Sequence, residues 1–396
     1  MKRIKIKIHR GTHQIGGIST EISTDKSRII IDMGDELSLD PNFKSQPLEI
    51  DGVTNSNGKC DGVLFTHYHG DHTGQMTRVR KDVPLYMGAL AKEIMLKSAT
   101  RCRRDTKELC ERIKSAIAIE GGAVLSFGDV TVTAYSIDHS ACDSYMFLIE
   151  AEGKRVLYTG DFRMHGFRGK AIPKILKKIG KVDALITEGT SLSRSNIHVM
   201  TEQELQKRVT EYMKEYKYVY VMCSSTNLER ICALSRAVPN GKYFVCDKYQ
   251  YELLEIIEKH WQKYSPLYGN VKKSYYDKNI VKGMKDRGFL MTVRDNSEFR
   301  KIIKSFDAQS GIILYSMWDG YRTAQDSAIP EFLKLTGTWA PLHTSGHATA
   351  EDIRRLIEIT APQVVIPMHT ASPDSIRTLC ARGQAVIIAD GQEITI

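Results

Sequence analysis

Short apolar runs dominate the first half of the chain. The first eight residues alternate charged and apolar side chains, which predicts an edge β-strand and lacks the continuous apolar stretch of a signal peptide. Further runs are β-branched or alternating, end at Gly or Asp turns, and predict strands. These runs are 28–32, 62–67, 84–87, 130–137, 144–150, 154–159 and 182–187. Helical spacing is found at 89–98 and 104–117.

The middle of the chain has a different pattern, in which strand-like and helix-like stretches alternate. Such alternation predicts a parallel α/β domain. The strand-like runs are 218–223, 243–246, 289–293 and 311–316, and the clearest helical stretches are 227–237 and 251–260. A helical stretch at 350–360 and strands at 364–368 and 385–389 follow. We therefore predict an α/β protein in which a domain at 195–340 is inserted between the first part, 1–194, and the completing part, 341–396, of another domain.

Four residues of metal-binding types occur within six positions after the strand-like run 62–66. The segment reads His67-Tyr68-His69-Gly70-Asp71-His72. Neutral imidazoles and carboxylates suit a divalent metal such as zinc. Alternate residues of an extended segment, His67 and His69, can point the same way, whereas Asp71 and His72 lie where a strand turns into a helix and can face a second metal. This spacing favours a metal site over a chance cluster of structural histidines.

The HxHxDH run is the signature of the metallo-β-lactamase superfamily, which the chain also resembles in later motifs. Asp32 resembles the early aspartate that supports the ligands, His139 the third ligand of the first metal, and Asp161 the aspartate that bridges two metals. Taken singly, His139 would be an ordinary structural histidine and Asp161 a turn residue, but they occur in the family's order at strand ends. The resemblance implies an αββα sandwich and two metals per chain. It assigns His67, His69 and His139 to the first metal and Asp71, His72 and His369 to the second.

Three segments of the latter half resemble the motifs of the β-CASP subgroup. Glu188 in Thr187-Glu188-Gly189-Thr190 resembles motif A, His347 in the run 343–348 resembles motif B, and His369 in the run 367–370 resembles motif C. This subgroup carries an α/β insertion between motifs A and B, where the middle domain lies here. The resemblance covers nearly the whole chain and is nearest to the RNase J family. It implies that Glu188 orients His347, that His347 contacts the scissile phosphate, and that Asp71 takes a proton from a hydroxide activated by two metals.

The chain departs from the RNase J pattern after His369. In the familiar motif C the histidine is followed by Gly-Glu, whereas here His369 is followed by Thr370-Ala371-Ser372-Pro373. One supporting carboxylate is therefore unaccounted for. The chain ends at Ile396, soon after motif C, and we expect the C-terminal domain of RNase J to be missing. Among relatives, a histidine in motif C accompanies RNA cleavage and Artemis-like DNA nucleases carry a valine, so His369 favours RNA.

A phosphate pocket is a further hypothesis. Ser224, Ser225 and Thr226 end a strand and open a helix, where backbone N–H groups form an anion site. Thr226 is alternatively a plain helix N-cap. Ser345 and Gly346, before His347, could complete a pocket for a terminal 5′-phosphate.

Composition is ordinary for a globular protein, with 42% hydrophobic and 26% charged residues, and no apolar run is long enough for a membrane span. We expect a cytoplasmic protein without a membrane partner. The eight cysteines form no CxxC pair, so we expect reduced thiols that are mostly small core residues. They are Cys60, Cys102, Cys110, Cys142, Cys223, Cys232, Cys246 and Cys380.

The net charge of +9 is concentrated in two stretches. Residues 78–114 hold eleven Lys/Arg against five Asp/Glu, and residues 163–181 hold seven Lys/Arg and no acid. Such clusters suit a polyanion, although a solvated basic surface is the commoner explanation. We expect Arg163, Arg168 and Lys170 to contact RNA.

These patterns together predict a metal-dependent ribonuclease, exonuclease or endonuclease, that hydrolyses RNA phosphodiester bonds. Zinc is the first choice for its two ions and manganese the alternative; a homodimer stays open. One alternative is a small-molecule metallohydrolase of the thioesterase or lactonase type, against which the insertion and the basic clusters argue. Another is a non-catalytic RNA-binding relative, although such proteins lose ligands that this chain retains. A flavodiiron-type oxidoreductase would need a carboxylate in place of His69.

Overall fold

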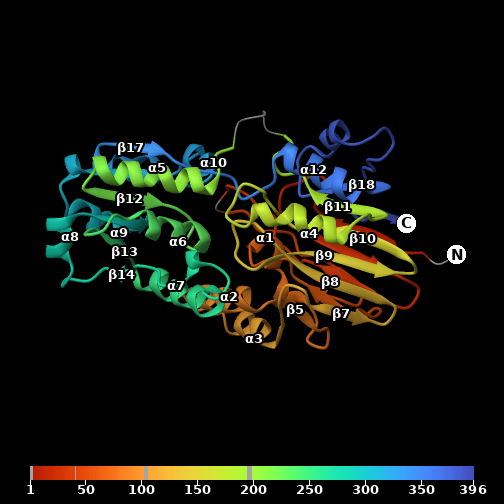
Figure 1. Ribbon diagram of the computed structural model, residues 1–396. Coiled ribbons are helices and arrows are strands. Elements are labelled where there is room, and N and C mark those ends of the chain that lie inside the picture. The colour runs from red at the N-terminus through yellow and green to blue at the C-terminus, as the bar shows by residue number, and fades with distance from the viewer. Residues whose placement is uncertain (1–2, 41, 102–105, 194–198) are drawn as a thin grey trace. The chain divides into compact units, whose positions relative to one another are not determined.

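The computed structural model describes residues 3–40, 42–101, 106–193 and 199–396. The chain forms two compact units, one of Met1–His198 with Gly346–Ile396 and one of Val199–Ser345. Each unit has its own sheets and its own hydrophobic core (Figure 1). The second unit occupies the stretch in which the sequence predicts an inserted domain.

Two β-sheets form the centre of the first unit, with strand orders β19-β1-β2-β3-β4-β5-β6 and β18-β11-β10-β9-β8-β7. The strands of the first sheet are β1 (Lys5–Arg10), β2 (Ser19–Ser23), β3 (Arg28–Ile31), β4 (Gly62–Leu64), β5 (Leu85–Gly88), β6 (Ile117–Ile119) and β19 (Glu393–Thr395). Those of the second are β7 (Val124–Phe127), β8 (Val130–Ile137), β9 (Ser144–Ala151), β10 (Lys154–Tyr158), β11 (Ala184–Glu188) and β18 (Val364–Met368).

The main core of the first unit lies between these two sheets. Alternate residues of β1, including Ile6 and Ile8, are buried, as the charged-apolar alternation predicts, and belong to one cluster with Val132 and Phe147 of the second sheet. Burial of each such side chain contributes roughly 1.5–3 kcal/mol. The two sheets therefore pack face to face through their apolar sides.

Helices cover the outer faces of the sheets. Leu176 of α4 (Ile172–Ile179) and Leu356 of α12 (Ala350–Thr360) pack with buried residues of the second sheet, and α2 (Ala89–Arg101) contacts β5 and β6 of the first. The other helices are α1 (Gly70–Thr73), α3 (Lys107–Ser115) and the 3-10 helices η1 (Met76–Arg78), η2 (Gly169–Ala171) and η6 (Pro373–Leu379). This layering confirms the predicted αββα sandwich.

The C-terminal segment returns to the first unit through β18. This strand runs parallel to β11 and places Ile366 beside Ile186 and Met368 beside Glu188. The end of β18 consequently lies at the same sheet edge as the end of β11, and His369 follows directly.

The second unit contains a parallel sheet of order β14-β13-β15-β12-β16-β17. Its strands are β12 (Tyr218–Met222), β13 (Tyr243–Cys246), β14 (Ser274–Tyr275), β15 (Phe289–Val293), β16 (Gly311–Tyr315) and β17 (Trp339–Pro341). Its helices are α5 (Glu202–Glu215), α6 (Leu228–Ala237), α7 (Lys248–Trp261), α8 (Val281–Arg287), α9 (Ser297–Lys304), α10 (Asp319–Thr323), α11 (Ile329–Leu333), η3 (Pro266–Tyr268), η4 (Ala308–Ser310) and η5 (Lys334–Thr336). The central strands β12, β15 and β16 are buried throughout, as strands of a parallel sheet usually are.

Three local predictions are wrong. Strand β1 is not an edge strand, because β19 pairs with the side that β2 leaves open. Residues 385–389 form no regular strand but an isolated bridge between Ala385 and Val365. Helix α6 is capped by Asn227, whose side chain accepts a hydrogen bond from the Arg230 N–H, and not by Thr226.

The cysteines that the structure describes are free thiols, and most are buried. Cys102 and the start of the predicted helix 104–117 lie outside the described residues. No helix in the described ranges is both long and apolar enough to cross a lipid bilayer.

Candidate metal centre

The metal-binding side chains predicted from the sequence converge at one edge of the two sheets of the first unit. His67 follows β4, His139 follows β8, Asp161 follows β10, and His369 follows β18. Asp71 and His72 lie on the short helix α1, and Gly34 leaves room for its backbone, since a Cβ atom there would lie 1.6 Å from the Asp71 carbonyl oxygen. Segments far apart in the sequence therefore deliver imidazoles and carboxylates to a single place.

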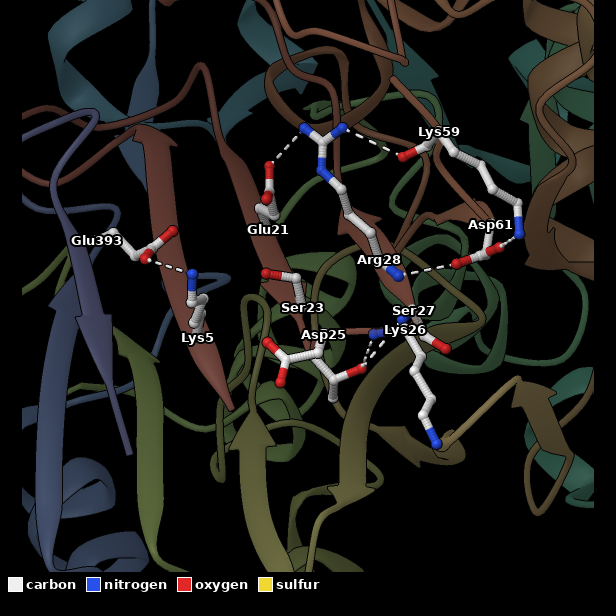
Figure 2. Close-up of a pocket in the computed structure, with 11 residues that line it drawn as sticks. Lys5, Glu21, Ser23, Asp25, Lys26, Ser27, Arg28, Lys59, Asp61 and Glu393 are labelled. Atoms are coloured by element: carbon white, nitrogen blue, oxygen red, sulfur yellow. Dashed lines mark hydrogen bonds and ion pairs between the residues drawn. The ribbon is translucent and has the colours of Figure 1, made fainter. Parts of the chain in front are cut away.

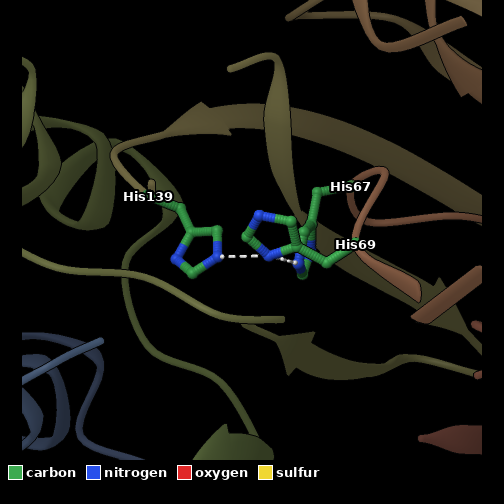
Figure 3. A group of neighbouring side chains, drawn as sticks. All are labelled: His67, His69 and His139. Atoms are coloured by element: carbon green, nitrogen blue, oxygen red, sulfur yellow. Dashed lines mark hydrogen bonds between the residues drawn. The ribbon is translucent and has the colours of Figure 1, made fainter. Parts of the chain in front are cut away.

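The first ligand group contains only histidines (Figure 3). His69 Nδ1 lies 3.1 Å from His67 Nε2 and 3.3 Å from His139 Nε2. Two tetrahedral nitrogen ligands of one zinc ion, each roughly 2.0–2.1 Å from it, are about 3.3–3.4 Å apart. His69 Nδ1 therefore lies at about the spacing that a zinc ion requires from each of the other two nitrogen atoms.

The second ligand group is mixed and consists of Asp71, His72, Asp161 and His369, whose donor atoms lie within 4.8 Å of one another. His369 Nε2 lies 3.1 Å from Asp71 Oδ2, and His72 Nε2 lies 3.3 Å from Asp161 Oδ2. All four residues are buried. Two carboxylates and two imidazoles again suit a divalent metal.

Asp161 lies between the two groups. Its Oδ2 atom is 3.9 Å from Nε2 of both His67 and His139 in the first group. The same oxygen is 3.3 Å from His72 Nε2 and 3.7 Å from His369 Nε2 in the second group. This is the position that the predicted bridging role requires.

The ring nitrogens that face away from the centre have their own partners. His72 Nδ1 lies 2.9 Å from the buried carboxylate of Asp32, as predicted for that aspartate, and His139 Nδ1 lies 2.6 Å from the Gly346 carbonyl oxygen. His369 Nδ1 lies 2.7 Å from the Thr190 hydroxyl. Such outer partners fix the ring orientation and leave Nε2 for the metal. No role was predicted for Thr190, whose hydroxyl is the partner of His369 Nδ1.

The electrostatics of the two groups differ. Burial, with the neighbouring imidazoles, holds the pKa of His67 well below its ordinary value, and burial lowers the pKa of His69 to about 4. The pKa of His72 is instead raised, because the carboxylates of Asp161, Asp32 and Asp71 outweigh the effect of burial. The first group thus presents neutral imidazoles, the form that binds metal, whereas the second carries the negative charge that a cation would neutralise.

Two buried polar atoms at the centre form no hydrogen bond within the described part of the chain. They are Asp161 Oδ1 and His72 Nε2. Buried polar atoms are almost always satisfied, so such atoms require an explanation. Metal ions bound by both groups would supply the missing partners, and the residues present therefore fit divalent metals.

The comparison with known families agrees with this geometry. Residues 27–218 match the profile of the family described as "Beta-lactamase superfamily domain". Residues 27–218 therefore carry a domain of the metallo-β-lactamase superfamily. The superfamily predicted from the HxHxDH run is confirmed.

Several proteins are similar over most of this chain. Ribonuclease J of Helicobacter pylori is 22% identical over an alignment that covers 92% of this chain and 56% of that protein. Ribonuclease J of Mycoplasma genitalium is also 22% identical, with 93% of this chain and 68% of that protein covered. This chain thus spans about half to two thirds of the length of these relatives. A crystal structure of a protein of unknown function from Enterococcus faecalis aligns over the whole of both chains with a TM-score of 0.80 at 19% identity, which shows a shared fold.

Next to the ligands of the lactamase domain, Glu188 and His347 form an ion pair. Glu188 is fully buried at the end of β11, and its Oε2 atom lies 3.1 Å from His347 Nδ1. Its Oε1 atom accepts a hydrogen bond from the Phe162 N–H at 2.9 Å. His347 Nδ1 also lies 3.6 Å from Asp161 Oδ2. Burial lowers the pKa of His347, but Glu188 and Asp161 outweigh it and raise the pKa to about 9.

The residues of the predicted phosphate pocket divide between the two units. Ser224, Ser225, Thr226 and Ser345 belong to the second unit, and Gly346 and His347 to the first. Ser225 is held by a residue that the sequence did not single out, Arg294, whose Nη1 donates to the Ser225 hydroxyl at 2.9 Å. Arg294 also pairs with Asp247, so the ends of β12, β13 and β15 are tied together. The only sequence signal was an arginine directly after a strand.

An open depression of about 310 Å³ lies at the opposite edge of the first sheet, near the start of β3 and β4 (Figure 2). Its charges pair with one another: Lys5 with Glu393, Arg28 with Glu21, and Lys59 with Asp61. Burial would raise the pKa of Glu21, but hydrogen bonds from His9 and Arg28 lower it to about 2. Because these groups satisfy each other, this depression does not resemble the metal centre.

One predicted RNA contact is wrong. Arg163, counted above in the basic stretch 163–181, is fully buried and paired with Asp138, so its side chain is not on the surface. Lys170 is exposed and Arg168 is partly exposed. The basic surface of this stretch therefore begins after Arg163.

Proposed function

We propose that the chain is a metal-dependent ribonuclease that hydrolyses RNA phosphodiester bonds, with the second unit acting as a β-CASP domain. The observation that carries the proposal is the Glu188–His347 pair directly beside the two ligand groups. Ligand groups of this kind suit hydrolases of many substrates. The Glu188 carboxylate raises the pKa of His347 and so favours a positive group beside the ligand groups, from which an anionic phosphodiester gains more than a neutral ester or lactone does. Similarity to proteins named Ribonuclease J supports RNA as the substrate.

The metal centre would hold two ions, zinc by first choice because its first group is wholly imidazole, with manganese as the alternative. When bound, such ions activate water for in-line attack and neutralise charge on the phosphate. Asp71, which is close to His369, would accept the proton released by the attacking water. His347, charged because of its raised pKa, would stabilise the phosphate oxygens or protonate the leaving oxygen.

We also propose how the 5′ end of the RNA is bound. Helix α6 begins at Leu228, directly after the Ser224, Ser225 and Thr226 hydroxyls, and the N-terminus of a helix favours an anion. We propose that these three hydroxyls, which belong to the second unit as does Ser345, receive a terminal 5′-phosphate. A 5′-phosphate bound in this pocket would fix which phosphodiester bond is cut and so give 5′-exonuclease cleavage. An RNA that binds without placing its 5′-phosphate there would be cut internally.

An end-mapped cleavage assay tests the function. A 5′-monophosphorylated single-stranded RNA is incubated with the protein and zinc or manganese, and both ends of each product are identified. Cleavage is expected, as single nucleotides in the exonuclease mode and as fragments in the endonuclease mode. DNA of the same sequence and a thioester or lactone are the control substrates. Ester hydrolysis without RNA cleavage under either metal would support a small-molecule metallohydrolase instead.

A further inference from the structure

The buried pair Arg163–Asp138 joins the loops that carry two predicted metal ligands. Asp138 immediately precedes His139, and Arg163 follows Asp161 by two residues. Both side chains have 0% exposure. A charged pair buried in this way is costly to desolvate and is retained only where it has good geometry or a specific task.

Three hydrogen bonds lock the two loops together. The Arg163 N–H donates to the Asp138 carbonyl oxygen at 2.8 Å, and Arg163 Nε donates to Asp138 Oδ1 at 2.9 Å. The Arg168 N–H donates to Asp138 Oδ2 at 2.8 Å. Both carboxylate oxygens of Asp138 are thus engaged by the loop that begins with Asp161.

Gly166 allows this loop to fold tightly around the pair. A Cβ atom at Gly166 would lie 2.3 Å from each carboxylate oxygen of Asp138 and 2.6 Å from Arg163 Nε. Any other residue at this position would displace the side chains of the ion pair, so the path of the loop is coupled to the pair.

We infer that Arg163 and Asp138 are positioning residues of the metal centre, which hold His139 of the first ligand group and the shared Asp161 in register. His139 Nε2 lies 3.9 Å from Asp161 Oδ2, so a shift of either loop changes the spacing of the two ligand groups. Residues that orient ligands in this way typically change metal affinity by about 10–100-fold when they are removed. The inference rests on the metal centre but not on RNA as the substrate.

The second unit offers a matched control. Arg230, 2% exposed, is paired there with the fully buried Glu202, and Arg230 Nη2 donates to Glu202 Oε1 at 2.6 Å and to the Thr344 carbonyl oxygen at 2.9 Å. Arg230→Met removes an equally buried arginine from a unit that contributes none of the predicted metal ligands. A loss of metal affinity caused by general destabilisation would therefore occur in both variants.

The experiment measures Zn²⁺ affinity by competition with a chromophoric chelator, at a temperature at which each metal-free variant is folded. Arg163→Met is expected to bind Zn²⁺ about 10–100-fold more weakly than the unsubstituted chain. Arg230→Met is expected to bind it unchanged. Arg163→Lys, which retains one charged hydrogen bond to Asp138, is expected to weaken binding less than Arg163→Met.

Several outcomes would overturn the inference. They are unchanged Zn²⁺ affinity in Arg163→Met, an equal loss in Arg230→Met, or an unsubstituted chain that binds no Zn²⁺. If Arg163→Met does not fold, Asp138→Asn decides the question by the same criteria, because it keeps the shape of the side chain and removes its charge. Zn²⁺ binding that weakens in these variants of a chain that cleaves no RNA would uphold the inference and reject the proposed substrate.

Discussion

Both units collect polar side chains where strands end, yet the two sets differ in kind. In the first unit the ends of β4, β10 and β18 lead to His67, Asp161 and His369, whose donor atoms converge. In the second unit the ends of β12 and β15 lead to Ser225 and Arg294, which bond to each other. Converging imidazoles and carboxylates bind a cation, whereas hydroxyls and a guanidinium suit an anion.

The difference also shows what distinguishes a binding site from a merely charged region. At the metal centre a buried oxygen of Asp161 and a buried nitrogen of His72 have no hydrogen-bond partner among the described residues. At the depression lined by Arg28 and Glu21 three pairs of opposite charges lie side by side. Unsatisfied, converging donors therefore indicate a ligand more reliably than charge density does.

The largest effect is expected from Asp161→Asn, because this substitution weakens the one oxygen shared by both ligand groups. Metal content, measured by elemental analysis, should fall from about two ions per chain, and RNA cleavage should fall by more than the roughly 10²–10³-fold typical of a single charge-stabilising group. Asp247→Asn, at a strand end of the second unit, is the matched control and should retain both ions. Equal metal loss in the two variants would contradict the assignment of metal binding to the strand ends of the first unit alone.

The next effect separates chemistry from metal binding within the first unit. His347→Ala should retain both metals, since His347 is assigned no metal, while cleavage falls by about 10²–10³-fold. Glu188→Gln should act in the same direction, because the carboxylate that raises the pKa of His347 is neutralised.

His369→Ala is the contrasting variant, since it removes a ligand of the second group and should lower metal content together with activity. Near-normal ribonuclease activity in His347→Ala, at full metal content, would show that motif B is a coincidence of sequence.

The candidate ligands of the run 67–72 could be recognised from the sequence because their spacing is local, whereas His139, Asp161 and His369 were assigned through the family resemblance. His67, His69 and His72 lie within one turn after a strand, so the chain itself brings them together. Apolar alternation predicted individual strands, which depend on neighbours in sequence. The αββα layering was predicted only through the resemblance to the superfamily.

The features that were missed depend on partners far away in sequence. Arg163 looked like a surface residue because it begins a basic run, and only its pairing with Asp138, 25 residues earlier, explains its burial. Strand β19 pairs with β1 from the other end of the chain, which is why β1 was mistaken for an edge. Thr190 lies 179 residues from His369, and nothing in either motif indicates their hydrogen bond.

A smaller effect is expected at the strand ends of the second unit. Arg294→Ala should leave metal content unchanged but release the Ser225 hydroxyl and remove a positive charge. The preference for 5′-monophosphorylated over 5′-hydroxyl RNA, measured as a ratio of kcat/KM values, should fall by about 10-fold, the scale of one charge-assisted hydrogen bond. Arg300→Ala is the control, because Arg300 forms a similar pair with Asp295 in the same unit. Reduced metal content in Arg294→Ala would contradict the assignment of this edge to an anion.

The smallest effect concerns a helix face in each unit. Exposed Lys174, Lys177 and Lys178 lie on α4 of the first unit without an acidic residue among them. Exposed Lys207, Arg208 and Lys214 lie on α5 of the second unit, where glutamates are interspersed. Only an unneutralised basic face should replace counterions on RNA, because cations beside carboxylates already have their own counter-charge.

Replacing the three α4 lysines by glutamine should therefore weaken RNA binding modestly and make its salt dependence shallower. For single-stranded RNA the slope of log K against log salt concentration should change by about 0.7 for each phosphate that the protein no longer neutralises. The corresponding triple substitution on α5 should change neither affinity nor slope by a comparable amount. If both triple variants shift the slope equally, RNA binds through net charge alone. If neither does, the basic face of α4 is solvated surface, and RNA must be bound by residues such as those of the basic stretch 78–114.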